Sequence, residues 1–146
     1  MALRGRFGSA RREADARHRA LSRGDAVALP CRLRRTSARG WGPWTSAELV
    51  LGALPDGGAR WRAPDPIAVG FPATRGPVDL PFTDVVEVAV RPVRFQTEAF
   101  HGMAAEIVVV VADPSTIELA LPPGESALAL DRLVELLPDG AARPQQ

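Results

Sequence analysis

The fold is decided by residues 104–137, AAEIVVVVADPSTIELALPPGESALALDRLVELL. A valine-rich strand ends at Asp113-Pro114-Ser115, and a second strand of period two follows, with its apolar positions at Ile117, Leu119 and Leu121. Pro122-Pro123-Gly124 ends that strand, and a helix then carries one apolar face, made of Ala127, Leu130, Leu133, Val134 and Leu137. A sheet that ends in one amphipathic helix uses the helix as its lid, so we expect the rest of the chain to complete the sheet.

Upstream of this stretch, an alternating segment predicts the first strand. Its inward-facing residues are Val27, Leu29, Cys31 and Leu33. Pro30 belongs to the outward set, which predicts an edge position or a bulge there, because proline has no N–H for a ladder hydrogen bond. Cys31 stands alone on a buried face and is expected to fill the core rather than to act as a nucleophile.

The remaining strands are separated by turn signals. We expect them at Trp44–Leu51, Ala59–Arg62, Ile67–Phe71, Val78–Phe82 and Val86–Val90. In the last of these, Val86, Val88 and Val90 are expected to face inward. Asp56-Gly57 predicts a hairpin turn, and Arg94–Met103 a polar connection. About seven short strands and one final helix predict a mainly β (α+β) fold, an antiparallel barrel or sandwich capped by the C-terminal helix.

Composition bounds the class of protein. A chain of 146 residues is long enough for one domain that buries about 70% of its unfolded surface. The single cysteine excludes an internal disulfide and fits a reducing cytoplasm. The longest apolar run, Ile107–Ala112, is far shorter than the ~20 residues of a membrane-spanning helix. No apolar segment follows the Arg-rich start, so no secretory signal is visible.

The net charge of +1 conceals a strong asymmetry. Residues 1–62 contain thirteen Arg and five acidic residues, whereas residues 63–146 contain five Arg and twelve acidic residues. Such polarity favours an anionic partner at one end, although a solvated surface also produces it. We divide the chain into a basic arm (1–24), helical or disordered, a folded domain (25–139) and a tail (140–146). The arm either has no partner or touches anionic lipid or nucleic acid.

The sequence carries no motif for catalysis or for a cofactor. It lacks a glycine-rich phosphate loop, Cys-x-x-Cys, His-Glu-x-x-His and Gly-x-Ser-x-Gly. Its two histidines, His18 and His101, are too few for most zinc sites, and Glu98 with His101 falls in an expected loop. We therefore predict a protein that is not an enzyme, with no catalytic residue, no metal and no cofactor, and no small-molecule substrate is evident.

Seven antiparallel strands closed by one C-terminal helix resemble the pleckstrin-homology-like (PH-like) fold. Residues 78–88, VDLPFTDVVEV, are similar to a strand join common in bacterial PH-like and GRAM-like domains. Over residues 17–138 the chain resembles an actinobacterial PH-like family of unknown function, in the ordered segments Arg17–Gly24, Cys31–Arg34, Gly40–Pro43, Arg60–Arg62, Arg91-Pro92 and Ile117–Leu121. That family has an N-terminal membrane anchor with no counterpart here. Either the native start lies upstream of Met1, or this member reaches the membrane through its arginines.

The resemblance also implies a binding site. In PH domains that bind phosphoinositides, basic residues of the first two strands and their loop hold the head group at the open end of the barrel. The matching positions here are Arg32, Arg34, Arg35 and Arg39, with Arg60 and Arg62 near the next turn. A guanidinium suits this role because it can donate two parallel hydrogen bonds to one phosphate. Thr45-Ser46-Ala47 replaces a further basic pair, which favours weak attraction to anionic lipid over stereospecific binding.

Three tryptophans surround the same region. Trp41, between two glycines, is a candidate contact to a membrane or a protein partner, because indole is apolar at one end and donates a hydrogen bond at the other. Trp44 and Trp61 are expected to pack on the barrel. Within this interpretation Trp41 joins the six arginines as a ligand-binding residue.

The leading hypothesis is a non-catalytic PH-like binding module, cytoplasmic and peripheral at the inner face of the cell membrane. Its Arg-rich barrel end would contact anionic lipid or an acidic partner. The alternative is a protein-interaction or scaffold domain without a lipid role, in which a sheet edge or the groove beside the final helix takes a peptide. Nucleic-acid binding ranks below both, because Phe7 is the only aromatic residue of the arm.

Overall fold

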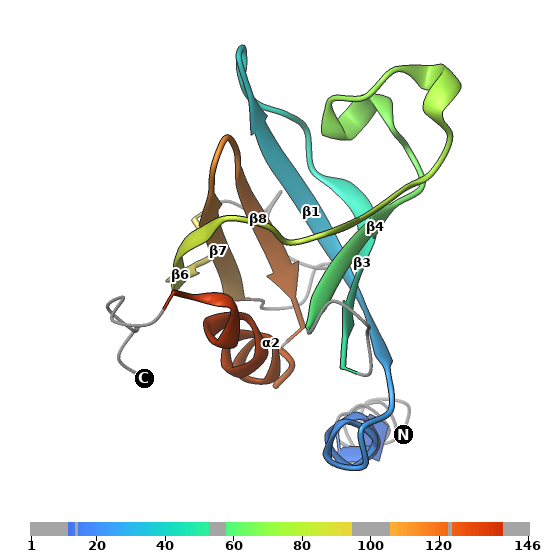
Figure 1. The fold of residues 1–146 in the computed structure, drawn as a ribbon, viewed down its shortest axis with the longest axis vertical. Coiled ribbons are helices and arrows are strands. Elements are labelled where there is room, and N and C mark those ends of the chain that lie inside the picture. Colours follow the sequence, from blue (N-terminus) through green and yellow to red (C-terminus); the bar gives the residue numbers. More distant parts are fainter. Residues whose placement is uncertain (1–11, 14, 53–57, 95–105, 123, 139–146) are drawn as a thin grey trace.

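The computed structural model covers residues 1–146 and describes residues 12–13, 15–52, 58–94, 106–122 and 124–138. These residues form one antiparallel sheet and a C-terminal helix that lies against it (Figure 1). The strands are β1 (Val27–Ser37), β2 (Gly40–Trp41), β3 (Thr45–Leu51), β4 (Ala59–Ala63), β5 (Val78–Pro81), β6 (Val85–Pro92), β7 (Glu106–Ala112) and β8 (Thr116–Leu121). The helical elements are η1 (Ile67–Val69), η2 (Ala73–Arg75), α2 (Ser126–Leu133) and η4 (Val134–Leu136).

The strand order explains why the sheet closes on itself. Neighbouring strands run β5-β4-β3-β1-β8-β7-β6, and the short β2 pairs with the end of β1. β5 and β6 lie at opposite ends of this order, yet only residues 82–84 join them. A link of that length spans at most about 14 Å, so the sheet must bend until its two edges approach. The predicted fold class, a mainly β PH-like sandwich of antiparallel strands capped by one C-terminal helix, is confirmed.

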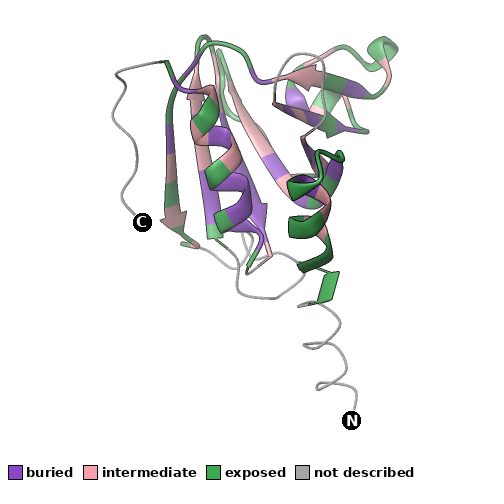
Figure 2. Ribbon diagram, turned by 60° about the horizontal axis from the view of Figure 1, so that its bottom comes forward, coloured by how far each residue is buried: buried purple, intermediate pink, exposed green. Residues whose placement is uncertain are grey.

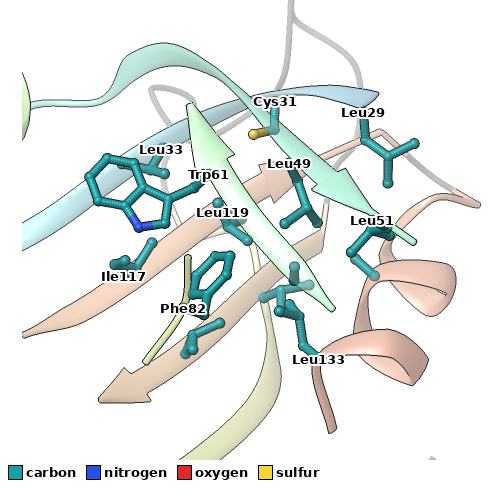
Figure 3. Packing of buried hydrophobic residues seen from close by; sticks show 14 of the residues in the cluster. Leu29, Cys31, Leu33, Leu49, Leu51, Trp61, Phe82, Ile117, Leu119 and Leu133 are labelled. Atoms are coloured by element: carbon teal, nitrogen blue, oxygen red, sulfur yellow. The ribbon is translucent and has the colours of Figure 1, made fainter. Parts of the chain in front are cut away.

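The interior of the bent sheet is filled by the apolar residues that alternate along its strands. Figure 3 shows the side chains of β1 and β3 meeting those of β4 and β8, with Trp61 and Phe82 beside Ile117 and Leu119. β1 buries the four residues that the sequence predicted, Val27, Leu29, Cys31 and Leu33. Burial raises the pKa of the Cys31 thiol to about 12, helped by the charge of Glu48, so Cys31 is a core residue and not a reactive thiol.

The C-terminal helix packs on β6 and β7, as Figure 2 shows from a second direction. Leu130, Leu133 and Leu137 are buried, as the apolar stripe predicted. Ala127, which was assigned to the same stripe, is exposed instead, and the buried face extends to Leu128, Ala129 and Leu130. Ser126, Ala129, Leu130 and Leu133 lie on one side of the helix at intervals of three and four residues, whereas Ala127 lies about 100° around the helix from Ser126, beyond the edge of that side.

Pro30 lies at a place where β1 has a strand partner on only one side. β3 pairs with β1 along Val27–Leu33, whereas β8 pairs with it over Arg32–Arg35. Within the described residues, the backbone at Pro30 therefore has no ladder neighbour on the β8 side, and proline is tolerated at such positions. The predicted edge position is correct locally, although β1 is central in the sheet.

The expected strand Ile67–Phe71 is wrong. Its first three residues form the 3-10 helix η1, within the long connection between β4 and β5. The side chain of Asp65 supplies the reason, because its Oδ1 accepts hydrogen bonds from the backbone N–H of Ile67 at 3.1 Å and of Ala68 at 3.4 Å. An aspartate that bonds the backbone two and three residues ahead starts a turn and competes with a strand.

The predicted inner face of β6 is also wrong in part. The ladder with β7 shifts between Val85 and Glu87, which marks a bulge in β6. A bulge adds one residue to the strand and so reverses the alternation around it. Val85 and Val88 face the core and Val86 is exposed, as the bulge requires. Val90 was also expected inside but is 37% exposed; it shares the face of Val88, so the bulge does not account for it.

Residues 12–13 and 15–22 are helical, and this segment touches the folded domain at two points. Leu21 is buried in the core, which its sparse apolar neighbours did not predict. Gly52, beside Leu21, has a φ of +78°, and a Cβ atom there would lie 2.8 Å from the backbone carbonyl oxygen of Asp25, so this position requires glycine. Arg17 forms an ion pair with Glu125 at the start of α2. The expected turn at Asp56-Gly57, residues 95–103 of the expected polar connection and the tail lie outside the described residues.

Candidate functional site

The structure separates the predicted ligand-binding residues into two places, one end of the barrel and the outer face of the sheet. Arg35, Arg39 and Trp41 belong to the end of the barrel away from α2, which we call the mouth (Figure 1). The mouth is formed by the hairpin of β1 and β2, by residues 64–77 with η1 and η2, and by the turn at 113–115. The side chains of the other four arginines, Arg32, Arg34, Arg60 and Arg62, alternate with inward-facing residues and therefore lie on the outer face of the sheet.

Arg34 is engaged by a carboxylate and two aromatic rings. Its Nε donates to Glu118 Oε1 at 2.8 Å, and its Nη2 lies 2.6 Å from the same oxygen. Its guanidinium carbon lies 4.4 Å from the ring centroid of Trp41 and 4.8 Å from that of Trp44. These are cation–π distances. Arg34 thus ties β1 to β8 and orders the two tryptophans on the outer face.

Glu118 binds a second arginine as well. Arg91 Nε donates to Glu118 Oε2 at 2.9 Å, and Arg91 Nη2 donates to Oε1 at 2.8 Å. Burial alone would raise the pKa of Glu118, but the hydrogen bonds from Arg91 and Arg34 outweigh it and hold the pKa below its ordinary value. Sequence reasoning did not find this buried group of charges, since its members lie 27 and 84 residues from Glu118 in the chain.

Arg60 and Arg62 share one partner on the edge strand. Arg60 Nε donates to Asp79 Oδ1 at 2.8 Å, and Arg62 Nε donates to Asp79 Oδ2 at 3.0 Å. The hydrogen bond from Arg60, with that from Arg62, holds the pKa of Asp79 below its ordinary value despite some loss of solvation. Two of the predicted cations are therefore partly neutralised at a site that does not belong to the mouth.

Arg35 is different because it points inward. It follows Cys31 and Leu33 on the inner set of β1, and at this position the barrel opens. Its Nε donates to Ser115 Oγ at 3.1 Å, and its Nη1 donates to the carbonyl of Val69 at 2.9 Å. These two bonds connect β1 to the turn before β8 and to η1, so the arginine spans the mouth.

Two aromatic rings flank the guanidinium of Arg35. Its central carbon lies 5.2 Å from the ring centroid of Phe71 and 5.9 Å from that of Trp61. Arg75 stacks on Phe71 as well, at 5.3 Å. Burial lowers the pKa of Arg35 from its ordinary value, although an arginine remains charged at any physiological pH.

A cavity of about 100 Å³ adjoins Arg35 at the mouth. Its walls include the hydroxyl-bearing Thr83 and Ser115, the ring of Trp61 and the exposed Asp113. No ion pair within the described residues joins Arg35 to Asp113 or to another carboxylate. Arg35 is therefore a half-buried cation, and three of the five N–H groups of its guanidinium have no acceptor in the part of the chain that the structure describes.

Two segments next to Arg35 carry exposed apolar side chains, although the ring of Trp41 itself stacks on Arg34 at the outer face. Trp41 is 44% exposed and Ile67 is 65% exposed. Their segments are neighbours, because a Cβ atom at Gly42 would lie 3.0 Å from the carbonyl oxygen of Ala68. Trp44 is half-buried and Trp61 is buried, as the sequence predicted for both. Arg39 lies exposed at the turn between β1 and β2.

Sequence reasoning found Arg35, Arg39 and Trp41 but missed Ile67, Phe71 and Ser115. The signal for the first two was Asp65-Pro66, a turn signature that excludes the strand assigned there. Ser115 follows Arg35 by 80 residues, and no local pattern links them. Among the described residues, no group of three His, Cys, Asp or Glu side chains is placed to hold a metal ion.

No helix within the described residues is both long enough and apolar enough to cross a membrane. Comparison of the chain with protein-family models, with curated proteins and with solved structures finds no match.

Proposed function

We propose that the chain is a non-catalytic PH-like binding module that contacts an anionic membrane surface through its mouth. The observation that carries the proposal is Arg35, a half-buried cation without a carboxylate partner among the described residues. The exposed residues Trp41 and Ile67 lie on the two segments that border it, next to Gly42 and Val69. An unpaired cation in a partly desolvated site gains most from an anion. The adjoining cavity has the volume of about three water molecules, which suits one phosphate group and not a whole head group.

The apolar residues give the contact its second component. Indole and isoleucine side chains gain free energy when they leave water for the membrane interface. Arg39 and Arg75, both exposed at the mouth, add attraction of about 1 kcal/mol per basic residue near an anionic surface. The remaining predicted cations contribute less, because Arg34 binds Glu118 and both Arg60 and Arg62 bind Asp79. Assignment to the PH-like family is part of the same proposal.

Vesicle flotation tests this function. Vesicles of phosphatidylcholine alone are compared with vesicles that also contain phosphatidylglycerol, at about 0.1 M and 1 M salt, where the Debye length falls from about 10 Å to about 3 Å. We expect flotation only with the anionic vesicles and mainly at low salt. Arg35→Gln removes the inward cation, and Trp41→Ser with Ile67→Ser removes the apolar contact. Both changes should weaken flotation.

Matched substitutions outside the mouth test whether flotation depends on the mouth or only on total charge and exposed apolar surface. Arg62→Gln removes an exposed cation that is paired with Asp79, and Val86→Ser removes an exposed apolar residue of β6. Both variants should float like the unaltered protein. Thermal unfolding of Arg35→Gln shows whether the variant is folded. The proposal fails if the protein ignores anionic vesicles, binds neutral ones equally, or loses binding to the same extent in the matched variants. The protein-interaction alternative then takes its place.

A further inference from the structure

A second cavity lies on the outer face of the sheet, apart from the mouth. It is a groove of about 460 Å³ over the ends of β3, β4 and β5. Pro64 and Pro77, where the chain leaves β4 and returns to β5, form part of its apolar wall. Small-molecule sites in proteins commonly have volumes of about 300–1,000 Å³, apolar walls and a few polar groups that orient the ligand. The groove has these properties.

Three charged side chains line the groove, and two of them neutralise each other. Arg62 Nε donates to Asp79 Oδ2 at 3.0 Å, and Arg60 also binds Asp79. Glu48 is the third. It lies directly opposite Arg62 in the β3–β4 ladder, yet the guanidinium of Arg62 turns to Asp79, and no ion pair or hydrogen bond to Glu48 is found among the described residues.

The carboxylate of Glu48 is half-buried. Its charge reaches the interior, because it helps to raise the pKa of the buried Cys31 thiol on the neighbouring strand. This carboxylate is incompletely solvated and forms no ion pair among the described residues, so it gains more from a cationic ligand than a fully exposed carboxylate would.

We infer that this groove binds a small organic cation, with its ammonium or guanidinium group at Glu48 and its apolar body against Pro64 and Pro77. The charge of Glu48 selects a cation over an anion or a neutral molecule. The apolar wall selects an alkyl or aryl amine over a simple ion such as ammonium. This inference does not depend on the membrane contact, because Glu48 lies on the outer face of the sheet and Arg35 does not line the groove; only Pro64 and Pro77 belong to both the groove and the segment 64–77.

Titration followed by ¹⁵N–¹H correlation NMR tests the inference with the full chain. The probes are pentylammonium, the neutral 1-pentanol, the anionic pentanoate and plain ammonium, which share either the chain length or the charge. We expect saturable shifts at Ser46, Ala63 and Val78, with pentylammonium binding tighter than any of the other three. Glu48→Gln, which keeps the size of the side chain, should weaken pentylammonium by about tenfold, the value of one charge-assisted hydrogen bond.

Two further variants make the result specific. Glu87→Gln removes an exposed carboxylate from β6 and should leave the affinity unchanged. Ser46→Phe places a bulky ring on the exposed wall of the groove and should abolish the shifts without disturbing the core, because Ser46 is exposed. The inference is overturned if 1-pentanol binds as tightly as pentylammonium, if Glu48→Gln binds normally, or if the shifts lie outside β3, β4 and β5. Vesicle flotation of Glu48→Gln should be normal, which separates this site from the proposed membrane contact.

Discussion

Glu118 holds together three strands through its two oxygens. It lies on β8, and its partners Arg34 and Arg91 lie on β1 and β6. The side chain is 6% exposed, against 21% for Arg34 and 11% for Arg91. These three charged side chains have lost most of their hydration, so each is stabilised mainly by the opposite charge of its partner.

We expect Glu118→Gln to lower the free energy of unfolding by about 3 kcal/mol, because it leaves two buried guanidinium groups without the carboxylate that both bind. Urea denaturation followed by far-UV circular dichroism measures the loss. Glu87→Gln is the matched control, since it is the same change on the exposed face of β6, and it should cost less than about 0.5 kcal/mol. Equal stability of the two variants would show that the buried group contributes nothing.

At the same scale, the sequence predicted the kinds of residue and not their pairing. Cys31 could be assigned to the core because strand alternation alone determines its direction. Arg34 and Arg35 are neighbours of the same type, yet one faces outward to Glu118 and the other inward to the cavity at the mouth. The alternation of a strand predicts that the two side chains point to opposite faces. It does not predict where the strand ends or that the barrel opens at Arg35, because both depend on the tertiary fold.

Among the elements, the short link between β5 and β6 is the corner that closes the sheet. Asp84 adopts a φ of 55°, and it is the only residue other than glycine with positive φ in the described part of the chain. Its carbonyl accepts a backbone hydrogen bond from Asp113 at 3.3 Å, which joins this corner to the turn before β8. A left-handed conformation costs an ordinary residue about 1–2 kcal/mol, and aspartate tolerates it better than most.

We expect Asp84→Gly to leave the free energy of unfolding within about 1 kcal/mol of its original value, because glycine relieves the backbone strain while adding freedom to the unfolded chain. Asp84→Val should lower it by about 2 kcal/mol, since a β-branched residue resists positive φ. Thermal and urea unfolding compare the two. If valine proved as stable as glycine, the backbone at Asp84 would not be held in the left-handed conformation.

Sequence reasoning succeeded for elements whose pattern is local and failed where a neighbouring element decides. β1, β7 and β8 carry their own alternation or apolar run, so they were predicted. The assignment of residues 67–71 failed because the Asp65 side chain accepts hydrogen bonds from the backbone N–H groups of Ile67 and Ala68, which outweighs the apolar run. The prediction of which β6 residues face inward failed at Val86 because of the bulge in β6. The bulge depends on the register with β7, and register is a property of two strands.

For the whole molecule, the charge asymmetry of the sequence does not become two simple faces. Four of the thirteen arginines of residues 1–62 pair with carboxylates that follow later in the chain: Arg17 binds Glu125, Arg34 binds Glu118, and both Arg60 and Arg62 bind Asp79. The charge asymmetry of the sequence therefore arises in part from ion pairs between the two halves of the chain, and not only from a surface for an anionic partner. Arg35 and Glu48 share three properties: each is half-buried, each borders a cavity, and neither forms an ion pair among the described residues.

The same pairing predicts how the stability of the molecule depends on pH. The pKa of Glu118 is lowered in the folded state, so the folded protein binds fewer protons than the unfolded chain in the acid range. Its contribution is fully present above the unfolded value of about 4.3 and is lost as the pH falls through the lower folded pKa. Asp79 acts in the same direction, but its side chain is 43% exposed and its share is small.

We therefore expect the difference in unfolding free energy between the unaltered protein and Glu118→Gln to be constant from about pH 7 to pH 5 and to shrink below about pH 4. In strong acid a protonated glutamic acid and a glutamine are both neutral, so the two proteins converge once Glu118 is protonated in the folded state. Urea midpoints measured across this range at fixed salt give the curve. A difference that stays constant or widens on acidification would mean that Glu118 is not an ionised partner of Arg34 and Arg91.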